Sequence, residues 1–186
     1  MALTLQQLTQ RIWIYTYEVA RDRPTLGYIR GDNCSIAIDA GHSADHTQGF
    51  YAALTAAGLP LPSLTILTHW HWDHTFGIHA VQGPCLANQR TNQHLADFRS
   101  TIEEKGREYF LSLHESIRNE YGDSTPITIQ LSQLLFTDTL SLDAGNCPLQ
   151  LLQSPSPHTD DATLISVPDE GVLFVGDAAG GTFPTW

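Results

Sequence analysis

Residues 64–77 of this chain read LTILTHWHWDHTFG, and the hexamer at 69–74, HWHWDH, holds three histidines and one aspartate. A short apolar run precedes the hexamer, and its isoleucine and threonines favour a buried β-strand. We expect that strand to deliver His69 at its C-terminal end. Surface or packing histidines rarely occur at such density after an apolar strand, so the hexamer favours a metal site.

Spacing within the hexamer adds to this interpretation. His69 and His71 lie two residues apart, so in an extended segment both side chains point the same way. The two intervening tryptophans then point the other way, where they can pack. Asp73 and His74 are adjacent, so we expect their side chains to diverge and to serve a second ion. A catalytic metal site requires imidazole and carboxylate ligands that converge on one point and leave a coordination position open.

The flanking sequence predicts strands, then helices, then strands again, which indicates a layered α/β domain. Ser43 is expected to cap a helix that stops at Gly58. A second, outer helix is predicted between Ser100 and Tyr121 from the spacing of its apolar residues. The predicted strands are 11–17, 25–30, 34–39, 64–68, 149–155, 162–168 and 171–177.

Composition limits the possible partners. The 186 residues, 41% hydrophobic, suit a single globular domain spanning 1–186. A net charge of -11 disfavours nucleic acid and anionic membranes, so we expect a small-molecule substrate. The N-terminus lacks the pattern of a secretory signal, and the three cysteines are isolated in sequence. A cytoplasmic protein with reduced thiols is the expectation.

The hexamer resembles the HxHxDH motif of the metallo-β-lactamase-fold hydrolase superfamily. Two other stretches match that family's pattern: DAG at 39–41 and PHTDDATLISVPDEGVLFVGDA at 157–178. The resemblance covers nearly the whole chain. It implies an α/β fold in which two mixed sheets form an αββα sandwich, with the site at one edge.

The resemblance also implies a binuclear metal site and assigns its ligands. The implied ligands of the first ion are His69, His71 and His158. Those of the second are Asp73 and His74, with Asp177 bridging the two ions. Asp39 is implied to orient a ligand histidine from outside the coordination sphere. Zinc is preferred, at one or two ions per chain, because three imidazoles are a familiar zinc set; iron and manganese remain open.

The implied activity is hydrolysis of a small carbonyl substrate, such as an ester, thioester, lactone or lactam, by a metal-bound hydroxide. Asp73 would orient that hydroxide and receive its proton. No serine or cysteine nucleophile motif is present, which agrees with water as the nucleophile. A phosphodiesterase is an alternative activity, and a degenerate, non-catalytic metal-binding protein is an alternative of another class.

The end of the chain departs from the family pattern. The family usually supplies one more histidine to the second metal, some tens of residues after the bridging aspartate. Here only AAGGTFPTW, residues 178–186, follows Asp177. We therefore expect a C-terminally incomplete domain, a more weakly held second ion and possible homo-oligomers.

The other histidines are not expected to be metal ligands. His42 and His46 flank the predicted helix start, where exposure to solvent is the expectation. His79, His94 and His114 have no ligand spacing and are expected to be surface or packing residues.

Overall fold

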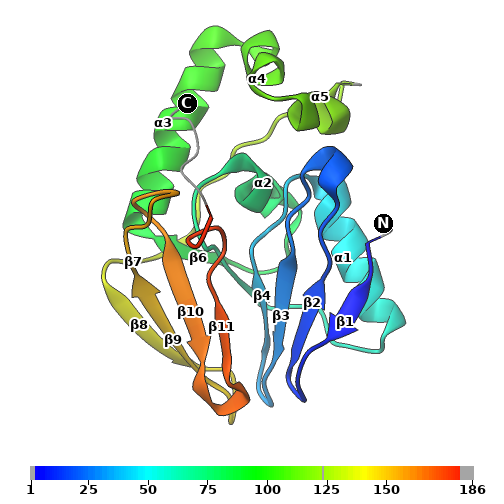
Figure 1. Cartoon of the computed structure of the whole chain (residues 1–186), viewed down its shortest axis with the longest axis vertical. Coiled ribbons are helices and arrows are strands. Elements are labelled where there is room, and N and C mark those ends of the chain that lie inside the picture. The colour runs from blue at the N-terminus through cyan, green and yellow to red at the C-terminus, as the bar shows by residue number, and fades with distance from the viewer. Residues whose placement is uncertain (1–2, 123, 181–186) are drawn as a thin grey trace.

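The computed structural model describes residues 3–122 and 124–180. Two β-sheets stack face to face, and helices pack around them (Figure 1). One sheet has seven strands in the order β1 to β7, and the other has four in the order β11-β10-β9-β8. The predicted α/β sandwich is therefore confirmed. Residues 181–186, part of the predicted incomplete end, lie outside the described residues.

The first sheet is mixed, as predicted. Strands β1 to β4 pair antiparallel, whereas β4 to β7 pair parallel. The parallel strands are connected through helices, as parallel neighbours require. The strand bounds are β1 Leu5–Gln7, β2 Ile12–Tyr15, β3 Leu26–Arg30, β4 Ser35–Ile38, β5 Leu64–Ile66, β6 Cys85–Asn88 and β7 Leu134–Phe136.

The second sheet corrects one detail of the prediction, because it is antiparallel throughout rather than mixed. Its strands follow one another through turns and one loop without a helical crossover, and such connections join antiparallel neighbours. The strand bounds are β8 Thr139–Asp143, β9 Pro148–Gln153, β10 Thr163–Val167 and β11 Val172–Phe174.

The main core lies between the two sheets and is made of aliphatic side chains from both. Ile12, Ile36 and Ile66 of the first sheet are 0 to 1% exposed, and they cluster with Leu149 and Ile165 of the second. Burial of each such side chain contributes about 1.5–3 kcal/mol relative to exposure. The core therefore fixes how the sheets stack, and with it the edge where the loops from both sheets meet.

Three helices replace the single helix predicted between Ser100 and Tyr121, so that prediction is wrong in its continuity. They are α3 (Gln89–Lys105), α4 (Arg107–Leu113) and α5 (Glu115–Tyr121). Gly106 ends α3 with a φ of 81°, a conformation that favours glycine, and His114 is extended between α4 and α5. Apolar spacing continues across both breaks, which is why the pattern resembled one helix.

The remaining helices lie against the first sheet or at its loop edge. Helix α1 (Ala44–Ala56) begins as predicted, since the Ser43 side chain accepts a hydrogen bond from the backbone N–H of His46. The short α2 (Trp72–Thr75) lies at the loop edge of the sandwich (Figure 1). Three 3-10 helices complete the described elements: η1 Val19–Arg21, η2 Ile78–Ala80 and η3 Pro168–Glu170. Among the described residues, no helix is both long and apolar enough to cross a membrane.

Candidate metal centre

The hexamer leaves β5 and turns directly into α2. Strand β5 ends at Ile66, and α2 begins at Trp72, so His69 and His71 lie in the connecting loop. Both histidines are buried, at 1% and 7% exposure. Trp72 is also buried and packs among aromatic side chains, as predicted, although one side of it lines the small cavity beside His71. The loop is therefore held by its tryptophans while its histidines gather at the sheet edge.

Three imidazoles converge at this edge, one of them from the other sheet. Nε2 of His69 lies 3.1 Å from Nδ1 of His71, and Nε2 of His158 lies 2.8 Å from the same atom. His158 comes from the loop between β9 and β10, 87 residues further along the chain. The structure thus brings together all three residues predicted for the first ion.

Charge and burial make these imidazoles a suitable donor set for a metal. Burial lowers the pKa of His71 to about 4, and it lowers the pKa of His69 well below its ordinary value. Both rings are therefore neutral at neutral pH and present lone pairs rather than a charge. Neutral imidazole nitrogens within 4.8 Å of one another fit a divalent cation such as zinc.

The residues predicted for the second ion lie beside this trio. Nε2 of His74 is buried without a hydrogen bond of good geometry, yet it faces carboxylate oxygens of Asp73 at 3.3 Å and Asp177 at 3.6 Å. The other oxygen of Asp177 lies 3.6 Å from Nε2 of His158. Asp177 therefore lies between the two sets of residues, where a bridging carboxylate would be.

The expected divergence of Asp73 and His74 is wrong. Residues 72–75 form the helical turn α2, and there the two side chains approach each other instead of alternating as on a strand. Burial lowers the pKa of His74, but the neighbouring carboxylates of Asp73 and Asp39 outweigh it and raise that pKa well above its ordinary value. The carboxylates around His74 therefore favour positive charge at this place.

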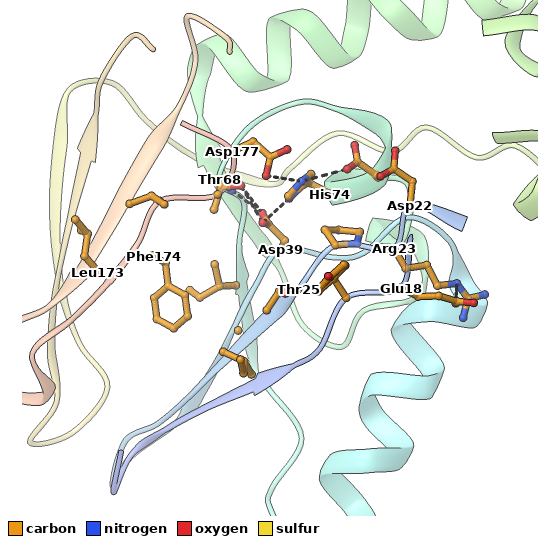
Figure 2. A pocket seen from close by; sticks show the side chains of 18 of the residues that line it. Glu18, Asp22, Arg23, Thr25, Asp39, Thr68, His74, Leu173, Phe174 and Asp177 are labelled. Atoms are coloured by element: carbon orange, nitrogen blue, oxygen red, sulfur yellow. Dashed lines mark hydrogen bonds and ion pairs between the residues drawn. The ribbon is translucent and has the colours of Figure 1, made fainter. Parts of the chain in front are cut away.

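Asp39 holds His74 from behind. Its Oδ2 lies 2.7 Å from Nδ1 of His74, and its Oδ1 accepts a hydrogen bond from the backbone N–H of Thr68 at 2.7 Å (Figure 2). Asp39 has a φ of 65°, in the left-handed region that non-glycine residues rarely adopt. Such strain concentrates at functional sites, and here it accompanies a carboxylate directed at a candidate ligand. The histidine that Asp39 contacts is thus His74.

Two groups of supporting residues were missed by sequence reasoning. The Thr68 hydroxyl lies 2.8 Å from Asp39 and 3.1 Å from Nδ1 of His69. Its place directly before the hexamer was the available signal. The second group comes from α3: Thr91 donates to Asp161 at 2.7 Å, and Asp161 follows His158 in the same loop. No local pattern links residues 70 positions apart.

His42 and His46 are buried, which corrects the expectation that they face solvent. Both are 0% exposed. Nε2 of His42 lies 2.7 Å from the carbonyl oxygen of Arg21, and its ring centroid is 4.6 Å from that of Trp72. Burial lowers the pKa of His46 to about 3, so this ring is a neutral packing group. His46 of α1 packs against Tyr15 of β2, and His42, just before α1, lies among η1, α2 and α5.

Two hollows adjoin the candidate ligands. A cavity of about 50 Å³ lies against His71, Asp73, His158 and Asp177, and its remaining lining is Asp22, Trp72 and His114. A larger cavity of about 650 Å³ extends between the sheets. Its lining runs from Asp39, Thr68, His74 and Asp177 to the apolar side chains of Leu173 and Phe174 (Figure 2). The candidate ligands are thus reachable from outside, as a catalytic centre requires.

Comparison with known proteins agrees with this fold. The family model described as the metallo-beta-lactamase superfamily matches residues 22–184. Similar solved structures include a metallo-beta-lactamase from Pontibacter korlensis, with a TM-score of 0.66 and 17% identity; the match covers 94% of this chain and 71% of that one. A motif mutant of a metallo-beta-lactamase from Cronobacter sakazakii has a TM-score of 0.67 and 17% identity, covering 98% and 68%.

One curated relative carries a different kind of name. A protein of Aspergillus versicolor, named as a proposed transcription factor, avaE, is 29% identical over 126 residues. The match covers 64% of this chain and 33% of that protein, so the chain spans about a third of the length of this relative.

Proposed function

The chain belongs to the metallo-beta-lactamase superfamily, and we propose that it is a metal-dependent hydrolase of a small carbonyl compound, such as an ester, thioester, lactone or lactam. The observation that supports this most directly is the convergence of His69, His71 and His158 beside a second set of ligand-type residues. The two adjoining cavities together give a substrate access to both sets.

In this proposal the two sets hold two ions, and zinc is the preferred metal. His69, His71 and His158 would hold the first ion. Asp73 and His74 would hold the second, and Asp177 would contact both. When bound, such ions polarise a carbonyl group and lower the pKa of a coordinated water towards about 7.

The protein's own residues orient the ligands and move the proton. Asp39 fixes the ring of His74 through Nδ1, which leaves Nε2 for coordination. The Asp73 carboxylate lines the cavity, and burial raises its pKa while the neighbouring His74 lowers it to a net value below its ordinary one. Asp73 therefore stays ionised at neutral pH and can accept the proton of the attacking water.

Hydrolysis assays with and without metal test this proposal. Purified protein is stripped of metal, reloaded with zinc and assayed on a panel of esters, thioesters and lactones. We expect turnover that chelation abolishes and zinc restores. A phosphodiester in the same panel tests the alternative activity. Zinc binding without hydrolysis of any compound would instead support a non-catalytic metal-binding protein.

The name of the Aspergillus relative describes a protein about three times as long as the matched region, so it does not assign a role to this chain. We propose a small-molecule substrate and no nucleic-acid partner, because the net charge of -11 repels phosphate backbones.

A further inference from the structure

The wall of the small cavity that faces the candidate ligands comes from three separate parts of the chain. Asp22 follows η1, Trp72 begins α2, and His114 precedes α5. A substrate whose carbonyl lies at the metal ligands extends from this small cavity into the larger one, and Asp22 lines both. The chemistry of the lining side chains therefore determines which substrates fit.

Among the described residues, no lysine or arginine side chain forms part of this wall. Arg23, which is next to Asp22, is engaged elsewhere: its guanidinium lies 2.9 Å from Glu120 and 2.5 Å from Asp45. Arg23 does line the larger cavity, but these two carboxylates hold its guanidinium, so a substrate carboxylate would find no unpaired lysine or arginine among the described lining residues.

Asp22 adds a carboxylate to this wall, and no lysine or arginine in the described part of the chain lines the wall to pair with it. Asp73 and Asp177 also line the cavity, but both are candidate metal ligands, so a bound cation would offset their charge. Among the described residues, the side chain of Asp22 has one hydrogen bond, a long contact of 3.5 Å from the Ser116 hydroxyl. In Figure 2, Asp22 and Asp177 lie on either side of His74.

The backbone conformation of Asp22 fixes where its carboxylate lies. Its φ and ψ are 57° and 40°, the left-handed region, where aspartate and asparagine are tolerated better than most residues. Its N–H bonds to the carbonyl oxygen of Val19 at 3.2 Å and closes the turn that directs the chain past the cavity. This turn holds the carboxylate at the mouth of the candidate site.

We propose that Asp22 selects the substrate of this site: an acyl compound with an ammonium or N–H group near its scissile carbonyl and no carboxylate. The inference rests on the proposed hydrolase function and narrows its substrate class. An exposed carboxylate attracts a nearby cation and repels an anion. Lactams that carry a carboxylate beside the ring are accordingly poor substrates, despite the fold shared with metallo-beta-lactamases.

Three thioesters of similar size but different charge test this selection. They are acetylthiocholine, its neutral isostere S-(3,3-dimethylbutyl) thioacetate and S-acetyl-3-mercaptopropionate, and thiol release is measured with zinc-loaded protein. We expect kcat/KM to fall in that order. Asp22→Asn should lower kcat/KM for the cationic thioester about two- to fivefold and change the neutral one little, as for an exposed ion pair. Asparagine also tolerates the left-handed backbone, so the variant should fold.

A matched control separates local from overall charge. Asp138 is exposed in the turn between β7 and β8 and lines neither cavity near the candidate ligands, so Asp138→Asn removes the same charge elsewhere. We expect this variant to keep the wild-type preference. Equal losses in both variants, or a wild-type preference for the anionic thioester, would overturn the proposal.

A binding measurement keeps the inference testable even without turnover. NMR titration with choline chloride should shift the indole N–H signal of Trp72, and sodium propionate should not. Asp22→Asn should weaken choline binding about two- to fivefold. Absence of thioester hydrolysis with choline binding intact would contradict the proposed function alone. Hydrolysis or binding that does not depend on Asp22 would contradict this inference alone.

Discussion

The two halves of the candidate metal centre are built differently, although they share one edge of the sandwich. The first set, His69, His71 and His158, consists of buried imidazoles contributed by both sheets. The second set depends on Asp177, which follows β11 and has a side chain 38% exposed. The first half is thus fixed by the stacking of the sheets, and the second includes one partly solvated carboxylate.

This difference has a thermodynamic consequence. Ligands that the fold has already ordered bind a metal without a further loss of conformational entropy, whereas an exposed side chain must be ordered on binding. We therefore expect the first half to keep its ion longer than the second. The predictions below begin with the substitution that should affect the centre most.

Removing His71 should have the largest effect, since Nδ1 of His71 is the atom that both other imidazoles approach. We expect His71→Ala to lower zinc affinity at least about 100-fold and to abolish hydrolysis. Zinc content after dialysis and thioester turnover measure this. His79→Ala, at an exposed residue outside the cavities, is the control. Similar zinc contents in the two variants would contradict the assignment of His71.

Asp177→Ala should have a smaller and more selective effect. It removes the carboxylate between the two halves and leaves the three imidazoles in place. We expect the second ion to be lost and turnover to fall about 10- to 100-fold, while the first ion stays bound. Metal analysis during stepwise chelation of wild type and variant measures this. Simultaneous loss of both ions from the wild type would show that the halves do not differ.

The sequence predicted which candidate ligands lie together much better than it predicted the contacts that hold them. The hexamer itself indicated the candidate ligands within residues 69–74. The resemblance added His158, Asp177 and Asp39, and the structure brings all of these residues to one edge. Thr91 could not be found this way, because its contact with Asp161 exists only after α3 packs beside the loop of the second sheet. Propensity and periodicity describe neighbours in sequence, whereas such contacts depend on tertiary packing.

Thr91→Val tests this supporting contact. It removes a hydrogen bond to Asp161, which is 0% exposed and belongs to the loop that carries His158. We expect zinc affinity to fall about tenfold, because supporting contacts orient the ligand. Thr101→Val is the matched control on the same helix, since the Thr101 hydroxyl bonds to the carbonyl of Asp97 within α3. Unchanged zinc affinity in Thr91→Val, with the fold intact, would mean that the loop holds His158 unaided.

Glu120→Gln should affect the metal centre least but should clearly lower the stability of the fold. Glu120 joins α5 to Arg23 and contacts no candidate ligand. Burial raises the pKa of Glu120, but hydrogen bonds and charge from His42 and Arg23 outweigh it and lower that pKa from 4.5 to about 2. Its folded pKa lies below its unfolded one, so its contribution to stability is complete above pH 4.5 and is lost as pH falls towards 2. At neutral pH we expect Glu120→Gln to be less stable by roughly 2 kcal/mol, allowing for solvent screening.

The same variant should show a flatter loss of stability between pH 4.5 and about 2, with zinc content near the wild-type level. Urea denaturation at a series of pH values measures the slope, and Glu103→Gln, at an exposed residue of α3, controls for the lost charge. If wild type and Glu120→Gln lose stability in parallel over this range, the contacts with His42 and Arg23 do not depress the pKa of Glu120. If the zinc content falls together with stability, α5 and the metal centre are coupled. The first half of the centre would then depend on this helix as well as on the stacking of the sheets.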